Sequence, residues 1–455
     1  MTNGRGELVN GRFERMNTTN LQSKHDRATP WWLWAVLATA LVLIFLRANR
    51  SNDDVRFWSY VTACAHADNW QGIYDKENNP FAFAPYGHLS LTMLLYPLGY
   101  LSMPAMRVFL ILAILGMWYA MFKFMQDGMR ERRLGFRGWV PWASAGPMIG
   151  MILAGRYLLN DLNLKQLNMI TFTCGCLGLW LMIPGKKWPA QFCGGVLLAF
   201  SIGLKLFTLP LLVMLVIKGD WRRAAGVSLA AIGIIWLLPR AVLGSTLYEE
   251  LSAVSNAATL NMWLQVKDTT QTWSFLNFVH YRIFVDPLWS GLDAMSPRVY
   301  QLICVLATVL IGLPTLRVLL RSRWRDENAT RLWEEIAMVG VAWALIDPDG
   351  RTAHFVTLVP AFSLIAYRRL EAWHDRREPP HWCQWMLSLT IGLTTLWLVR
   401  LPEPLAHHWY MQYGLFSTGL FLLYGMTYYE IRHAERFAVA QAADDPKPHQ
   451  QLAAA

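Results

Sequence analysis

The stretch from Val299 to Leu320 reads VYQLICVLATVLIGLPTLRVLL, and the basic run Arg321 to Arg325 follows it at once. This length approaches the roughly 20 apolar residues with which an α-helix crosses about 30 Å of hydrocarbon. Two further runs, Trp31 to Leu46 and Trp409 to Tyr424, have the same character. The apolar runs therefore predict helices that cross a lipid bilayer.

The composition of the whole chain indicates the same class of protein. Its 455 residues are 54% hydrophobic and only 16% charged, whereas soluble proteins carry about 25% charged residues. The net charge of +10 arises from short basic clusters between apolar runs, which is the positive-inside pattern of membrane proteins and not a nucleic-acid-binding face. The clusters are Arg130 to Arg133, Lys186-Lys187, Arg222-Arg223, Arg321 to Arg325, Arg368-Arg369 and Arg376-Arg377.

Placing the basic clusters in the cytoplasm predicts an all-α, polytopic transmembrane bundle of about 12 helices over residues 31–437. Residues 1–30 are expected to form a cytoplasmic tail. Residues 438–455 are expected to form a second, disordered cytoplasmic tail, because they are polar and have no core to join. The first external loop is expected to be large and to carry interfacial helices. The expected external loops are residues 49–87, 156–165, 244–297, 347–354 and 400–408.

Two segments need a special arrangement. Residues 88–102 are predicted to be interfacial or re-entrant, because the charge rule allows only an odd number of crossings before the next basic cluster. The segment from Trp188 to Ile217 has basic flanks at both ends, so it must cross an even number of times. With Lys205 and Pro210 near its middle, it predicts a hairpin of short helices whose tip faces outside.

An ordered series of polar and aromatic motifs occupies the first external loop and the segment after it. The series resembles the opening signature of glycosyltransferase family 87, an integral-membrane family of the GT-C type. The family shows an Asp before an aromatic run, a Gly-x-x-Tyr-Asp-like turn, a Tyr-Pro-Pro and a Pro-Leu. The matching segments here are Asp54-Val-Arg-Phe-Trp-Ser-Tyr60, Gly72-Ile-Tyr74-Asp75, Phe83-Ala-Pro85-Tyr86 and Tyr96-Pro97-Leu98.

The resemblance extends over most of residues 50–370. Gln166-Leu-Asn168 looks like the Gly-Gln-x-Asn of the family, although Lys165 stands where the family has Gly. An Ala/Gly-rich helix ending in Lys205 follows, as in the family. The segment from Asp347 to His354 looks like Ser-Pro-x-Ser-Trp-x-His-His, with Asp349-Gly-Arg351-Thr-Ala-His354 in place of its second half.

The chemistry of such a transfer sets the site residues. An acceptor hydroxyl needs a base, and a carboxylate near the membrane surface is suited to that task. The departing lipid phosphate needs cations, and a single displacement inverts the sugar carbon. Asp54 is the expected base, with Asp53 as the alternative. The expected donor-phosphate contacts are Lys205, Arg351, His354 and Lys165, and the substrate-positioning residues are Gln166, Asn168 and Tyr86.

Each of these assignments has a structural alternative. Lys205 could extend toward the headgroups, and Gln166 and Asn168 could form interhelical hydrogen bonds. A capping role for His354 is also open. The cysteines lack the spacing of redox or zinc motifs, so neither a metal nor a cofactor is expected.

The resemblance implies transfer of a hexose, with mannose as the expected sugar, from a polyprenyl-phosphate sugar to a lipid or glycan acceptor. The active site would be extracytoplasmic, in a bacterial-type inner or plasma membrane, with both termini in the cytoplasm. A secondary transporter and a lipid-linked glycan ligase remain alternatives. Acidic and basic groups converging at the bilayer midplane would favour transport, and convergence under the first external loop would favour transfer.

Overall fold

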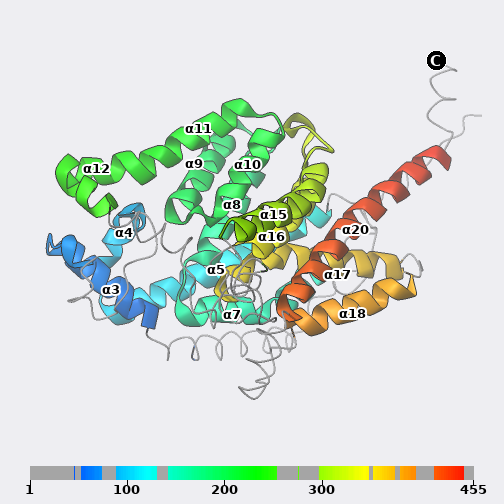
Figure 1. Cartoon of the computed structure of the whole chain (residues 1–455), viewed down its shortest axis with the longest axis horizontal. Coiled ribbons are helices and arrows are strands. Elements are labelled where there is room, and N and C mark those ends of the chain that lie inside the picture. Colours follow the sequence, from blue (N-terminus) through cyan, green and yellow to red (C-terminus); the bar gives the residue numbers. More distant parts are fainter. Residues whose placement is uncertain are drawn as a thin grey trace, which may run out of the picture.

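The computed structural model describes residues 46, 53–73, 89–130, 142–253, 275, 297–347, 352–374, 380–395 and 415–444. Within these ranges the chain forms fifteen α-helices, several shorter helical turns and no strand, which confirms the all-α prediction (Figure 1). Two helical segments, Met103–Met129 and Trp221–Leu243, are long and apolar enough to cross a membrane, and shorter apolar helices accompany them. The number of crossings stays a prediction.

The first described elements pack together at one edge of the bundle. Helix α3 (Asp53–His66) lies against the 3-10 turn η2 (Tyr96–Tyr100) and against α5 (Met103–Arg130). Short α4 (Leu89–Leu95) contacts both α3 and η2. The segment expected to be interfacial or re-entrant is therefore two short helical pieces, and a single 28-residue helix follows them.

The pair α6 (Trp142–Leu153) and α17 (Val359–His374) packs closely because α6 presents glycine to its neighbour. A Cβ atom added at Gly150 would lie 2.1 Å from the Ser363 hydroxyl oxygen and 2.5 Å from the Ser363 backbone nitrogen. Small residues allow this approach between helices in membranes, where the lipid provides little hydrophobic drive for association.

Four helices and the turn η3 lead to the polar end of the bundle. The residues expected to form a polar loop at 156–165 are helical instead, in α7 (Gly155–Leu164), and α8 (Asn168–Leu181) follows. Helix α9 (Trp188–Leu204) ends at Lys205, whose backbone is extended. The turn η3 (Leu206–Thr208) then leads into α10 (Leu209–Ile217), which has a proline in its first turn. The two short helices predicted on either side of Lys205 are thus confirmed.

The remaining helices complete the bundle. A helical rod comprises α11 (Trp221–Ile232), a π-helical turn (Gly233–Leu237) and α12 (Leu238–Leu243). The later elements are α15 (Pro297–Leu319), α16 (Ala329–Ile346), the 3-10 turn η8 (Thr352–Leu358), α18 (His381–Thr395) and α20 (Leu415–Asp444). Helix α20 continues past residue 438 to Asp444, so the disordered tail expected from residue 438 is helical in its first part.

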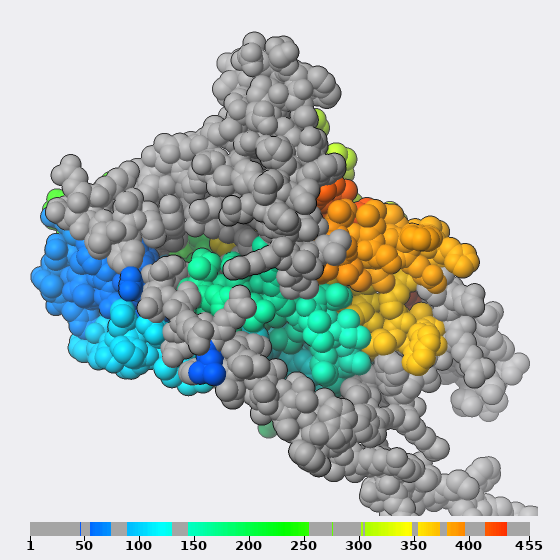
Figure 2. All heavy atoms as spheres, turned by 90° about the horizontal axis from the view of Figure 1, so that it is seen from below, coloured from blue at the N-terminus to red at the C-terminus, as the bar shows by residue number. Residues whose placement is uncertain are grey.

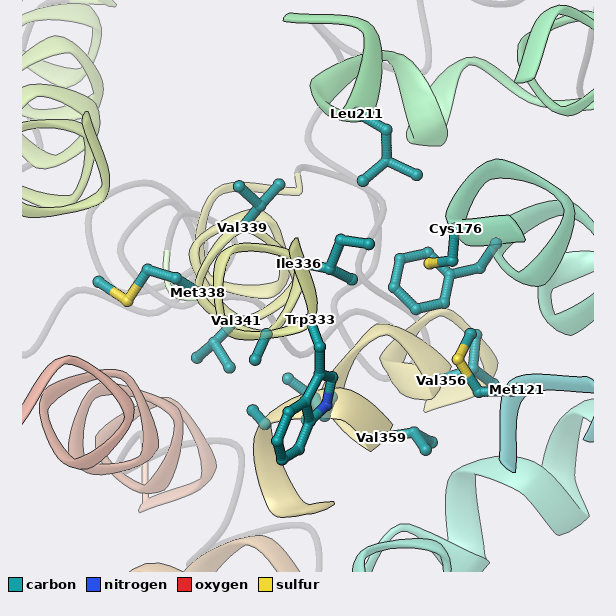
Figure 3. Packing of buried hydrophobic residues seen from close by; sticks show 14 of the residues in the cluster. Met121, Cys176, Leu211, Trp333, Ile336, Met338, Val339, Val341, Val356 and Val359 are labelled. Atoms are coloured by element: carbon teal, nitrogen blue, oxygen red, sulfur yellow. The ribbon is translucent and has the colours of Figure 1, made fainter. Parts of the chain in front are cut away.

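Helix α16 is the centre of the core. Most of its residues are buried, including the two carboxylates Glu334 and Glu335 in its first half, which is typical of a helix with neighbours on every side. Figure 3 shows its side chains pointing in different directions, among them Trp333, Ile336 and Val339. The surrounding residues Met121, Cys176 and Leu211 come from α5, α8 and α10 and belong to the same buried cluster.

A group of buried charges lies at the end of the bundle where α16 begins, and we call it the ionic network. The Lys218 ammonium donates hydrogen bonds of 2.8 and 2.9 Å to the Glu335 carboxylate and also pairs with Glu327. Arg321 pairs with Glu334 at 2.9 Å. The network comprises Lys218, Arg321, Glu327, Glu334, Glu335, Arg368 and Glu371, with Arg368 bridging Glu334 and Glu371.

Candidate functional site

The site lies at the opposite end of α16, where several elements end or begin. The turn η8 contacts α7, α8 and α16. The turn η3 contacts α8, α9 and α10. Helix α3 also contacts α7, and Figure 2 shows α3 in blue and the teal segment of α6 and α7 on one face of the molecule. Motifs far apart in the sequence are therefore brought to one end of the bundle.

Lys205, Asn168 and Gln166 form a chain of hydrogen bonds at this end. The Lys205 ammonium donates to the Asn168 side-chain oxygen at 2.7 Å. The Asn168 amide nitrogen donates to the Gln166 side-chain oxygen at 2.7 Å. Asn168 is the first residue of α8 and is fully buried. Three of the residues predicted from the sequence are thus held together by one amide.

Asp161 belongs to the same group, and sequence reasoning did not identify it. Its carboxylate is fully buried on α7 and accepts a hydrogen bond of 3.3 Å from the backbone N–H of Met169, in the first turn of α8. Burial raises the pKa of the Asp161 carboxyl, and the nearby positive charge of Lys205 opposes that shift. We call Asp161, Gln166, Asn168 and Lys205 the amide–lysine cluster.

Lys165 forms the turn between α7 and α8. Its φ of 52° and ψ of 37° are left-handed, a conformation that favours glycine at a helix C-terminus. Its side chain is fully buried, and its ammonium donates to the backbone oxygen of Asn163 at 2.9 Å. A non-glycine residue in this region costs about 1–2 kcal/mol, and such strain is typically found where function requires it.

His354 lies beside the amide–lysine cluster through η3. Its Nδ1 is 3.1 Å from a carboxylate oxygen of Asp347, the residue that ends α16. The His354 ring is parallel to that of Phe207, with 6.1 Å between the ring centroids. Phe207 follows Lys205 by two residues, so this ring contact joins η8, which carries His354, to the turn η3 next to Lys205. Asp347 is a second site residue that sequence reasoning did not assign.

The side chains of the other predicted site residues are not described by the structure. Asp53 and Asp54 are the first two residues of α3, and their side chains are not described. Tyr86 and Arg351 fall outside the described ranges. Contact between α3 and α7 nevertheless places the helix that carries both carboxylates beside the element that carries Asp161.

Lys205 and His354 are side chains of a kind that can donate hydrogen bonds to an anion. The carboxylate of Asp347 fixes the orientation of the His354 ring. Hydrogen bonds from such groups to phosphate are charge-assisted and stronger than neutral ones. Among the described residues, no group of three or more His, Cys, Asp or Glu side chains could hold a metal ion.

Comparison with known proteins identifies one family. The model for glycosyltransferase family 87 matches residues 89–348. The matched region includes the amide–lysine cluster, Lys165 and Asp347, whereas His354 and the first-loop carboxylates lie outside it. No curated protein and no solved structure matches the chain at a significant level.

Proposed function

Because the chain belongs to glycosyltransferase family 87, we propose that it transfers a hexose, with mannose as the expected sugar, from a polyprenyl-phosphate sugar to an acceptor hydroxyl. The acceptor is a lipid or a glycan on the extracytoplasmic side of the membrane. The family is membrane-associated, in agreement with the apolar helices of the chain.

The observation that carries this proposal is that basic side chains from separate motifs, Lys205 and His354, lie on elements joined by the ring contact of Phe207 with His354. Lys205 is held by Asn168, and His354 is held by Asp347 beside Phe207. A phosphate between these groups would meet positive charge in a region with little water, where electrostatic stabilisation is strong. The predicted site residues Gln166, Asn168, Lys205 and His354 lie toward the same end of α16, which supports transfer over transport through a midplane site.

The proposed reaction is a single displacement. The acceptor oxygen attacks the anomeric carbon of the sugar as the bond from that carbon to the phosphate oxygen breaks. The polyprenyl phosphate leaves with the electron pair of that bond, and the Asp54 carboxylate takes the proton of the acceptor hydroxyl. Attack from the face opposite the phosphate inverts the anomeric centre.

The remaining residues hold the donor or support those that do. Lys205, Arg351 and His354 contact the phosphate, while Gln166, Asn168 and Tyr86 position the substrate. Lys165 contributes positive charge from the α7–α8 turn, where its ammonium also supports the Asn163 carbonyl. Asp161 and Asp347 act through their neighbours: Asp161 by capping α8, and Asp347 by orienting His354.

Incubation of the purified protein with a panel of polyprenyl-phosphate sugars and candidate acceptors tests this proposal. We expect one donor to be consumed and a product of inverted configuration to form. Asp54→Asn should lower kcat about 10²- to 10⁴-fold, the usual contribution of a general base, with no change in protein abundance. Asp68→Asn, beyond the other end of α3, is the matched control and should retain full activity.

The outcomes separate the possible failures. Full activity of Asp54→Asn would remove Asp54 from the role of base, and loss of activity in Asp53→Asn alone would assign that role to Asp53. If the wild-type protein consumes no donor of the panel, the proposed transfer itself is wrong.

A further inference from the structure

Asp161 is a buried carboxyl close to a cation that reaches the surface. Its side chain is fully buried, and one oxygen, Oδ2, accepts the hydrogen bond from the backbone N–H of Met169. Within the described residues no group donates to the other oxygen, Oδ1, with hydrogen-bond geometry. Lys205, by contrast, is only half-buried. A ligand at this end of the bundle can therefore contact the lysine, whereas the carboxyl acts on that ligand through its charge.

Two adjacent residues of α8 hold the lysine and the carboxyl together. The Asn168 side-chain oxygen accepts from the Lys205 ammonium, and the backbone of the next residue, Met169, donates to Asp161. Burial raises the pKa of the Asp161 carboxyl above its ordinary value, and the positive charge of Lys205 opposes that shift. The protonation of Asp161 therefore depends on whether the charge of Lys205 is free to act on it.

Other charged or basic groups lie on the elements packed against α7, which are α3, α6, α8 and η8. They are Arg156 of α7 itself, Lys165 of the turn after it, His354 of η8 with its partner Asp347, and Arg56 and His66 of α3, which begins with Asp53 and Asp54. Of the described groups, Lys205 is the one whose charge acts on Asp161. The pair of Lys205 and Asp161 can therefore be treated as one unit.

The arrival of a phosphodiester changes the charge balance of this pair. With Asp161 ionised the pair is neutral, so a bound phosphodiester would leave one negative charge without a partner beside a buried carboxylate, which is costly. With a proton on Asp161 the pair has a charge of +1, which the phosphodiester balances. The bound anion also offsets the effect of Lys205 on Asp161, which raises the pKa of that carboxyl further.

We propose that Asp161 is a positioning residue that holds a proton while a phosphodiester is bound at Lys205, so that donor binding is coupled to protonation of this carboxyl. The inference rests on the proposed function, because it takes the anion at Lys205 to be the phosphate of the donor. The proton comes from the solvent, and no bond of the donor breaks in this step. Because the protonated form binds the anion more tightly, the affinity falls as the pH rises through the pKa of Asp161.

The pH dependence of phosphate binding tests the inference. The probe is a polyprenyl methyl phosphate, a phosphodiester that has no sugar and keeps a single negative charge throughout the titration. From about pH 6 to about pH 9.5, below the pKa of about 10.4 of a lysine, we expect the Kd of the purified protein to rise with pH. Uptake of one full proton corresponds to a rise of about tenfold per pH unit. Isothermal titration calorimetry in two buffers of different ionisation enthalpy counts the proton.

Asp161→Asn separates the charge of this residue from its role in holding α8. The asparagine oxygen can still accept from the Met169 N–H, but the side chain does not titrate. The Kd of this variant should be independent of pH, and no proton should be taken up. Asp220→Asn is the matched control, because Asp220 caps the first turn of α11 through the Arg223 N–H in a similar way. It should retain the pH dependence of the wild type.

Infrared difference spectroscopy gives a readout that does not depend on turnover. When the probe is added at the alkaline end of the range, the wild type and Asp220→Asn should gain the C=O band of a protonated carboxyl. Asp161→Asn should not gain this band. Absence of the band from the wild type would overturn the inference, whether or not the variant folds.

The results distinguish this inference from the proposed transfer. An affinity of Asp161→Asn that falls with pH as steeply as that of the wild type would overturn the inference, because another group, such as His354, would then take the proton. Proton-coupled binding that Asp161→Asn abolishes, without consumption of any donor sugar, would support the role of Asp161 and contradict the transfer. Consumption of a donor together with binding that does not depend on pH would overturn the role of Asp161 and leave the transfer intact.

Discussion

The two ends of α16 carry polar clusters of different kinds. Near its N-terminus, Glu335 and Glu334 belong to the ionic network, in which carboxylates pair directly with lysine and arginine. At its C-terminus, Asp347 orients His354, and the neighbouring amide–lysine cluster holds its cation through the side-chain oxygen of Asn168. One end matches charge with charge directly, whereas at the other a neutral amide holds a lysine whose positive charge also acts on the buried Asp161 carboxyl.

This difference predicts that one end of the bundle serves mainly stability and the other mainly ligand binding. A buried charge requires partners, and in the ionic network those partners are fixed protein groups on α16 and α17 and in the segments that follow α10 and α15. An ammonium held by an amide keeps most of its attraction for an anionic ligand. We therefore expect substitutions in the ionic network to affect folding and substitutions in the amide–lysine cluster to affect catalysis.

The largest expected effect on stability is that of Lys218→Met. The substitution keeps the length of the side chain but leaves Glu327 and Glu335 facing each other without the ammonium. Removing one partner of a buried ion pair costs about 3–5 kcal/mol, and thermal unfolding in detergent measures that loss. The activity per folded molecule should equal that of the wild type.

The matched control for this variant is Lys187→Met, because Lys187 is exposed in the turn before α9. Its effect should stay within about 0.5 kcal/mol, as is usual for surface positions. Equal thermal stability of Lys218→Met and Lys187→Met would show that the ionic network does not hold the helices together.

Lys205→Met should have the opposite profile. Loss of a cation that stabilises the leaving phosphate should lower kcat about 10²- to 10³-fold. The stability change should stay within about 1 kcal/mol, since Asn168 is neutral and Asp161, whose pKa burial already raises, can take up a proton once the opposing charge is gone.

Lys205→Arg is the informative companion variant. It retains the positive charge but not the compact ammonium, so its activity should lie between those of the wild type and Lys205→Met. If Lys205→Met destabilises the protein as much as Lys218→Met, the division between a stabilising end and a binding end is wrong.

The sequence predicted the helical fold and part of the site for identifiable reasons. A lysine and a proline inside an apolar segment mark the break between α9 and α10, so Lys205 could be found without a structure. Asp161 lies in a polar stretch that reads equally well as a loop, and its burial depends on helices that pack only in the folded chain. Lys218 and Glu335 are separated by 117 residues, and no local pattern pairs them.

A single acidic residue beside an apolar helix is therefore the sequence signal from which Asp161 and Asp347 could have been predicted as site residues. Asp161 and Asp347 each stand at the polar end of an apolar segment, where an ionisable residue needs a partner or a function. Sequence reasoning assigned that importance to Lys205 because of its position. The same argument, applied to the two carboxylates, would have placed them in the site.

The smallest expected effect is that of substitutions at a turn. It concerns the turn beside the ionic network, which is compared with the turn beside the amide–lysine cluster. Gly219, next to Lys218, has a left-handed φ of 79°, and Lys165 has the same hand beside the amide–lysine cluster. Gly219→Ala should lower the free energy of unfolding by about 1 kcal/mol through backbone strain alone, because no atom lies within 4 Å of the added Cβ. Gly226→Ala, at a right-handed helical position, should raise it by up to about 1 kcal/mol. Thermal unfolding of both variants should thus give shifts of opposite sign at unchanged activity, and shifts of the same sign would contradict the left-handed turn. Shifts of opposite sign would show that glycine avoids backbone strain at position 219. Lys165, whose φ is also left-handed, retains a side chain at the corresponding turn beside the amide–lysine cluster despite such strain.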